Sequence, residues 1–236
     1  MYIRTKAIVL SVIKYNDNSA IIKTYTEKTG FTSYFIRNFY KSRKIKKALF
    51  QPNNLLELWA TAKNKGQLEY IKEAQSFYHY KNLHADYDKL NISTFMREIL
   101  LESLKNEQAD EELFAFISRE FIELDQTNFQ ADFHLVFMLL LSKYLGFFPD
   151  IQSQGKYFDL QNGFFTDNLP PFQHLNAADT KLFRDFLGTI FATKKNIKNK
   201  HSGRIKLLNI MLEFYRLHID QFNEPKSVKV LHGLYN

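Results

Sequence analysis

The stretch KAIVLSVIKYNDNSAIIKTYTEKTGFTSYFIRNF, residues 6–39, decides the fold of the first part of the chain. Its apolar and β-branched residues fall into three short runs, at residues 6–15, 19–26 and 31–39. Turn-forming residues separate these runs, because Asn, Asp and Asn occupy residues 16–18 and the second turn ends in Gly30, which tolerates positive φ. The pattern predicts three antiparallel strands joined by tight turns.

Two more strands are expected before residue 78. The first lies within residues 49–62 and is opened by Pro52, because a missing N–H is tolerated at the start or edge of a strand. The second covers residues 68–74 and follows a turn at residues 64–67. Five short strands joined mostly by turns predict a small closed β-barrel of the OB type over residues 1–78.

From about residue 80 the apolar period changes from two to about 3.6, which predicts helices. They are expected near residues 92–104, 113–124, 133–144, 182–191 and 205–219. Asp110 and Asn128 are the expected caps of the second and third helices, and Gly146 is expected to end the third. Residues 150–175 lose the period and predict a loop or a small β insertion. The predicted fold class is therefore α+β with two domains, an OB-type barrel (1–78) and an all-α domain (79–236).

Composition excludes several classes of protein. The chain has 236 residues, a formal net charge of +7 and no cysteine, so disulfides, Cys-ligated zinc and thiol catalysis are excluded and a reducing cytoplasmic location is expected. The longest strongly apolar run, residues 133–141, is far shorter than the ~20 residues that span a bilayer, so no membrane partner is expected. No phosphate-binding glycine loop, zinc-protease motif or nucleophile elbow occurs. We therefore expect no catalysis, no cofactor and no metal.

The positive charge is concentrated at the start of the chain. The net charge is +9 over residues 1–75, −6 over 76–149 and +4 over 150–236. The segment YKSRKIKKALFQP, residues 40–52, carries five basic residues within positions 41–47. Ordinary solvated faces could account for uneven charge, but so dense a run repels itself unless an anion such as a phosphate backbone relieves it. We predict sequence-tolerant DNA binding, because phosphate contacts carry no base information. The predicted DNA-binding residues are Lys6, Arg37, Lys41, Arg43, Lys44, Lys46 and Lys47.

Aromatic residues beside this segment are candidates for base stacking. We select Tyr34, Phe39 and Tyr40 and expect Phe31 and Phe35 in the barrel core. A second basic run joins the last two long helices and is either an extension of the DNA path or a solvated loop. Its members are Lys194, Lys195, Lys198, Lys200 and Arg204.

Short motifs in a fixed order resemble one known family. They are AIVL (7–10), TEKTGF (26–31), ALFQP (48–52), YLGFFPD (144–150) and PKS (225–227). In these motifs the chain resembles the RecO family of bacterial recombination mediators. The resemblance implies an OB domain followed by a helical domain, a cytoplasmic and nucleoid-associated location, and no enzymatic turnover.

The resemblance also implies partners. Proteins of this family bind single- and double-stranded DNA and anneal complementary strands. They engage the acidic C-terminal tail of single-strand-binding protein and act with RecR to load RecA on the DNA that this protein coats. RecA is thus an indirect partner.

The chain departs from the family pattern at two places. Many relatives carry a four-Cys zinc motif just after the YLGFFPD step, whereas residues 151–170 contain no cysteine, so we expect a hydrophobic substitute there. The residues expected to form it are Tyr157, Phe158, Phe164 and Phe165. The helix at 135–145 also lacks the basic residues that relatives place near its start to hold the carboxylate of the partner's tail. Arg97, Arg119 or Lys143 could serve instead.

Two alternatives to a recombination mediator stay open. One is a general OB-type binder of single-stranded DNA or RNA without mediator activity. The other is an interaction scaffold whose charge serves an acidic protein partner.

Overall fold

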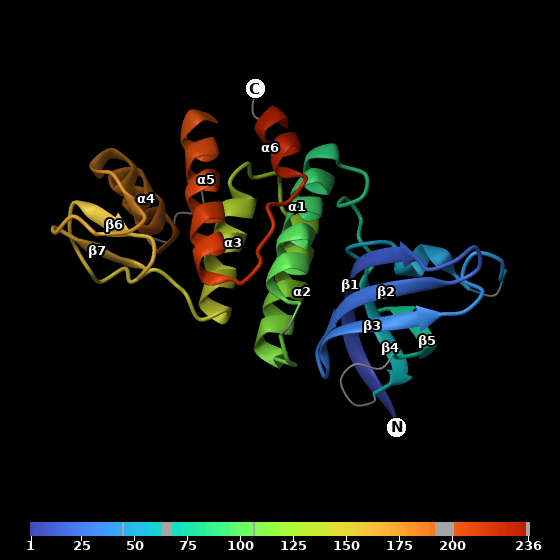
Figure 1. Ribbon diagram of the computed structural model, residues 1–236. Coiled ribbons are helices and arrows are strands. Elements are labelled where there is room, and N and C mark those ends of the chain that lie inside the picture. The colour runs from blue at the N-terminus through green and yellow to red at the C-terminus, as the bar shows by residue number, and fades with distance from the viewer. Residues whose placement is uncertain (44, 63–67, 106, 192–200, 235–236) are drawn as a thin grey trace. The chain divides into compact units, whose positions relative to one another are not determined.

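The computed structural model describes residues 1–43, 45–62, 68–105, 107–191 and 201–234 (Figure 1). The chain divides into two compact units, Met1–Asn128 and Phe129–Asn236. Within the described ranges, no helix is both long and apolar enough to cross a membrane.

The first unit is built on a five-stranded antiparallel sheet with the order β3-β2-β1-β4-β5. The five predicted strands are confirmed, with shifted ends. Their bounds are β1 Tyr2–Lys14, β2 Ala20–Thr26, β3 Gly30–Ile36, β4 Leu55–Thr61 and β5 Ile71–Ser76. The predicted turn at 64–67 falls wholly within residues 63–67, which lie outside the described part of the chain.

The sheet is of the OB type but is not a closed barrel. A parallel bridge between Tyr34 and Glu69 joins the edge strand β3 to the opposite edge of the sheet, because Glu69 lies two residues before the edge strand β5. Phe35 N donates to Glu69 O at 2.8 Å, and Glu69 N donates to Ser33 O at 3.3 Å. Beyond this bridge, the short 3-10 helix η1 (Lys47–Phe50) contacts β5. The predicted OB-type fold is therefore confirmed, but the predicted closure of the barrel is wrong, because in the described residues the edge strands β3 and β5 are not neighbours in the sheet and the two edges meet at an isolated bridge.

The core of the sheet lies on its inner face. Ala7, Val9, Ile22 and Leu56 are fully buried there, and Phe50 reaches them from η1. Ile8 and Leu10, on the opposite face of β1, are also buried, and α1 contacts β1. The middle of β1, residues 7–10, is thus apolar on both faces because it is covered on both.

Two helices, α1 (Tyr87–Ser103) and α2 (Glu111–Gln126), complete the first unit. The predicted cap of α2 is confirmed, because the Asp110 carboxylate accepts from Leu113 N at 2.9 Å. The loop between the helices packs on the β2–β3 turn, where Tyr25 Oη donates to Gln108 O at 3.1 Å. Gly30 has φ +66°, and a Cβ there would lie 2.5 Å from the Gln108 carbonyl carbon. The strands and these helices therefore form one unit, which extends past the predicted division at residue 78.

A buried carboxylate fixes the connection between β5 and α1. Asp125, at the end of α2, accepts from the backbone N–H of Lys81, Asn82 and Leu83 at 2.7–3.1 Å. The Tyr78 hydroxyl donates to its other oxygen at 3.0 Å. Burial alone would raise the pKa of Asp125, but these hydrogen bonds outweigh it and lower the pKa.

The second unit contains helices and a small sheet. The elements are α3 Phe133–Tyr144, β6 Tyr157–Asp159, β7 Phe164–Thr166, β8 His174–Leu175, α4 Ala177–Phe191, α5 His201–His218 and α6 Val228–Leu234. The Asn128 cap is wrong, because α3 begins after Asp132. The end of α3 at Gly146 is confirmed, since Gly146 has φ +83° and Phe147 N donates to Ser142 O at 3.0 Å.

The segment at 150–175 is a small β insertion, with strand order β7-β6-β8. Phe158 is fully buried at its centre, with ring centroids 4.8 Å from Phe165 and 4.9 Å from Phe183. Tyr157 and Phe164 point to the other face and stay partly exposed, because side chains alternate along a strand. Two of the four predicted aromatics thus form the hydrophobic centre and two do not.

Candidate nucleic-acid interface

The basic segment, residues 41–47, follows β3 and leads into η1. Tyr40 N donates to Asn18 O at 3.1 Å, which holds the start of the segment against the β1–β2 turn. Lys41, Arg43 and Lys46 are exposed, and Lys47 is exposed while its Nζ donates to Tyr40 O at 2.8 Å. Lys44 lies outside the described residues. The start of the segment is therefore held in place while its cations are exposed to solvent. Exposed cations of this kind can contact the phosphates of a nucleic acid.

Two of the three predicted stacking residues lie in the core. Phe39 is 4% exposed and its ring centroid lies 5.9 Å from that of Phe50. Tyr34 is 0% exposed, and burial raises its pKa to about 12. The stacking prediction for Tyr34 and Phe39 is wrong, because both side chains point into the sheet's inner face. Tyr40 is 36% exposed and keeps its place as a candidate.

The outer face instead carries an aromatic group formed by Tyr15, Phe35 and Tyr70. The Phe35 ring lies edge-on to Tyr15 at 5.4 Å and to Tyr70 at 6.2 Å between centroids. Tyr15 is 59% exposed, Tyr70 is 41% exposed and Phe35 is partly exposed. Exposed aromatic rings are suited to stacking on bases. Sequence reasoning placed Phe35 in the core, and the alternation along β3 was the signal that could have corrected it.

Basic side chains lie around the aromatic group and on the neighbouring strands. Lys23 faces outward on β2, where its neighbour Ile21 is the cross-strand partner of Phe35. Arg37 is exposed directly after β3. Lys6 is exposed on β1, with its Nζ 5.7 Å from the Phe77 ring centroid. Arg37 and Lys6 are thus accessible, as DNA-binding residues must be.

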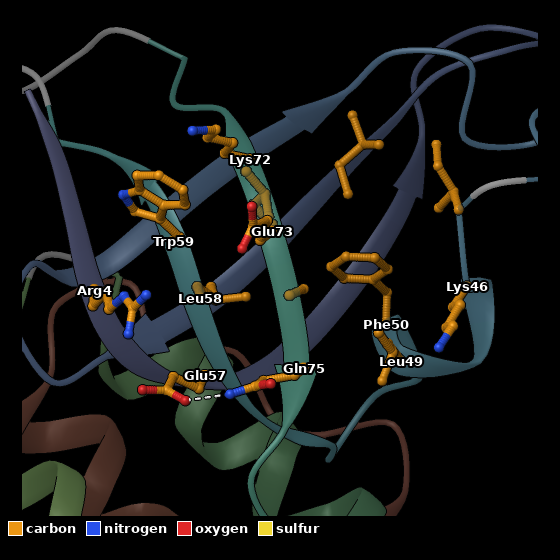
Figure 2. Close-up of a pocket in the computed structure, with 14 residues that line it drawn as sticks. Arg4, Lys46, Leu49, Phe50, Glu57, Leu58, Trp59, Lys72, Glu73 and Gln75 are labelled. Carbon is orange, nitrogen blue, oxygen red and sulfur yellow. Dashed lines mark hydrogen bonds between the residues drawn. The ribbon is translucent and has the colours of Figure 1, made fainter.

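A groove of about 500 Å³ runs along β5 (Figure 2). Its apolar lining comes from η1, the basic segment, β3, β4 and β5 and includes Ile36, Ile45, Leu49, Phe50, Leu58, Ile71 and Ala74. Its polar lining includes Arg4, Lys46, Glu57, Lys72, Glu73 and Gln75, together with Trp59. Glu57 accepts from the Gln75 amide at 2.6 Å. Sequence reasoning missed this groove, because it depends on which strands are neighbours.

The three residues suggested for the partner's tail have different environments. Arg97 is partly buried, its Nη1 donates to Leu10 O at 2.9 Å, and burial lowers its pKa. Arg119 is exposed on α2 and lies 3.4 Å from Glu120. Lys143 is exposed on α3 in the second unit. The Arg97 side chain thus binds the backbone of β1 from α1. Of the three residues, Arg119 and Lys143 are the accessible cations.

Most of the second basic run is outside the described residues, namely Lys194, Lys195, Lys198 and Lys200. Arg204, at the start of α5, donates to the Asp132 carboxylate at 2.8 Å. That ion pair is largely buried and uses the guanidinium within the second unit, so the prediction of Arg204 as a free DNA contact is wrong. In the described ranges no cluster of three or more His, Asp or Glu side chains is arranged to hold a metal ion.

Comparison with known proteins gives matches over nearly the whole chain. The family model described as Recombination protein O N terminal matches residues 1–80, and the model described as Recombination protein O C terminal matches residues 84–227. Three similar relatives carry the name DNA repair protein RecO. Those of Christiangramia forsetii and Flavobacterium johnsoniae are each 36% identical, and that of Flavobacterium psychrophilum is 37% identical; each match covers 100% of both chains.

Proposed function

The chain belongs to the Recombination protein O family, and on that premise we propose that it is a DNA repair protein that mediates homologous recombination. It binds single- and double-stranded DNA without sequence preference and anneals complementary strands. It then helps to load RecA on DNA coated by single-strand-binding protein, together with a RecR-like protein.

One observation carries the DNA-binding part of the proposal. The exposed basic segment is held against the β1–β2 turn through Tyr40 and Asn18, and Tyr15 of the aromatic group directly precedes that turn. Cations and exposed rings together form the combination that OB-type proteins use for single strands. Phosphates would meet the basic segment, and bases would stack on the aromatic group.

Annealing follows from the same chemistry. Two single strands repel each other through their phosphates, and clustered lysine and arginine side chains screen that repulsion. Phosphate contacts leave the Watson–Crick edges of the bases free to pair. The protein would act by holding strands and not by making or breaking covalent bonds, so we propose no enzymatic turnover.

The partners are proposed from family membership. The acidic C-terminal tail of single-strand-binding protein needs an accessible cation, and Arg119 or Lys143 can supply one. An Arg119→Glu variant and a Lys143→Glu variant, each tested for binding to the tail peptide, identify which unit carries this contact. Equal binding by both variants and the wild type would rule out both residues.

The deciding experiment measures annealing of complementary oligonucleotides coated with the cognate single-strand-binding protein. At low salt the wild type should accelerate annealing, and reversal of Lys41, Arg43, Lys44, Lys46 and Lys47 to Glu should abolish the acceleration. No acceleration by the wild type would refute the mediator proposal.

The alternative, a general single-strand binder for DNA or RNA, is favoured by the aromatic group, because stacking is indifferent to sequence. It would be preferred if oligonucleotide binding persisted while neither RecR nor the tail peptide bound. Unchanged DNA binding by the charge-reversed variant would instead favour a scaffold for an acidic protein.

A further inference from the structure

Trp59 lies on the outer face of β4. It belongs neither to the basic segment nor to the aromatic group of the proposed DNA interface. It is the only tryptophan of the chain and is partly exposed. Its cross-strand partner on β1 is Arg4 and its partner on β5 is Glu73. The Tyr2 ring lies edge-on to it, with centroids 5.9 Å apart. An aromatic platform with a neighbouring arginine is therefore available on the β1–β4–β5 face.

Lys72 covers this platform. The register of β4 and β5 shifts between Trp59 and Ala60, so that Trp59 opposes Glu73 whereas Ala60 opposes Ile71. This β-bulge leaves Lys72 as an extra residue and turns it to the outer face beside Glu73. The Lys72 Nζ lies 3.4 Å from the centroid of the Trp59 ring (Figure 2).

An exposed cation–π contact of this kind is weaker than the stacking of a base on an aromatic ring. A base can therefore displace the ammonium, and the flexible lysine stem lets that ammonium meet a phosphate of the same strand. We propose that Trp59 is a stacking position for a base of single-stranded nucleic acid, and that Lys72 moves from the ring to the backbone of the bound strand. This inference rests on the proposed DNA-binding function.

The position of Trp59 links the two parts of the candidate interface. Tyr70 of the aromatic group is only two residues before Lys72, a distance of roughly 7 Å along an extended chain. On the other side, Lys46 of the basic segment lines the same groove as Trp59 and Lys72. A strand stacked on the aromatic group can thus continue across the start of β5 to Trp59.

The carboxylates of the groove favour a base over a phosphate at this position. Glu57 and Glu73 line it together with Gln75. Carboxylates repel a phosphate but accept hydrogen bonds from the N–H groups of bases, which include the ring N–H of thymine. The cations Arg4, Lys46 and Lys72 remain to contact the backbone.

Trp59 also provides the measurement, because tryptophan emission, excited selectively over that of the tyrosines, comes from this residue alone. The wild-type protein is titrated with oligo(dT) of about 16 nucleotides, the upper end of OB site sizes. Intrinsic fluorescence is followed in parallel with the anisotropy of a labelled copy of the oligonucleotide. Quenching of Trp59 with the same midpoint as the anisotropy change is expected.

Variants separate stacking from charge. Trp59→Ala should weaken binding about 5- to 150-fold, as for loss of one stacked base, whereas Trp59→Phe keeps a ring and should bind within a few-fold of the wild type. Lys72→Met should reduce the log–log salt slope by about 0.7. Lys28→Met removes an equal charge from an exposed site on the β2–β3 turn and should leave the Trp59 response unchanged.

The two proposals fail in different ways. An anisotropy change without a Trp59 response, or equal binding by wild type and a folded Trp59→Ala variant, overturns this inference and leaves the proposed function intact. If Trp59→Ala does not fold, the wild-type emission and the salt slope of Lys72→Met still decide. Absence of any anisotropy change at low salt overturns the proposed function as well.

Discussion

Neutralising the accessible part of the basic segment should change how DNA binding responds to salt. The variant carries Gln in place of Lys41, Arg43 and Lys46, three exposed cations of the basic segment, and keeps Lys47, whose Nζ donates to Tyr40 O. Each phosphate contact to a single strand contributes roughly −0.7 to the slope of log affinity against log salt, so the three contribute about −2.1. Between ~50 and ~200 mM salt this corresponds to about a 20-fold difference in the affinity lost.

The assay is the anisotropy of labelled oligo(dT) at four or more salt concentrations. The wild type should show the steeper slope, and the two proteins should converge in affinity at high salt. A control variant with Gln at Lys28, Lys226 and Lys229 loses the same charge at other exposed positions and should keep the wild-type slope. Equal slopes for the wild type and the basic-segment variant would refute the reasoning, because those side chains would then meet no phosphate.

Three further changes probe the aromatic group and the two cores. Phe35→Ala should weaken oligo(dT) binding by about 1–3 kcal/mol while Phe35→Tyr should not, and equal affinities would exclude stacking there. Asp125→Asn should lower the free energy of unfolding at pH 7 by about 1–3 kcal/mol in denaturant titrations. Because the folded-state pKa of Asp125 is lowered, its stabilisation is complete above the unfolded pKa of about 3.9 and is lost as the pH falls through the folded pKa. The difference in the free energy of unfolding between wild type and Asp125→Asn should therefore shrink in acid. A difference that grows would contradict a lowered pKa for Asp125. Phe158→Ala should cost the second unit about 3–5 kcal/mol, and a loss below about 1 kcal/mol would show that its ring is not central.

The strands and helices were largely predictable because their signals are local. Alternation with turn residues marked the strands, and Asp110 marked the start of α2. β4 lies within the predicted range 49–62 but begins at Leu55 and not at Pro52, because residues 52 and 53 form a turn between η1 and the strand.

The site was harder to predict because it depends on strand phase and sheet order. Tyr34 and Phe35 are adjacent aromatics, and only the pairing of Tyr34 with buried Ile22 decides which one faces inward. The sequence interpretation exchanged their roles. Tyr70 meets Phe35 only because β3 and the residues before β5 lie together, and Tyr15 meets it because β1, β2 and β3 are successive strands of the sheet. No local pattern indicates the first of these contacts.

The packing of the α1–α2 loop on the β2–β3 turn has a consequence for how the chain can be divided. Gly30 sits against the backbone of residues 107–109, and Tyr25 donates to Gln108. A fragment ending between the two family models, near residue 80, would expose this surface of the strands to water and lose the helix that covers β1. Residues 1–128 should instead unfold cooperatively as one piece. Fragments made to study nucleic-acid binding should therefore end after Asn128, where the compact unit ends.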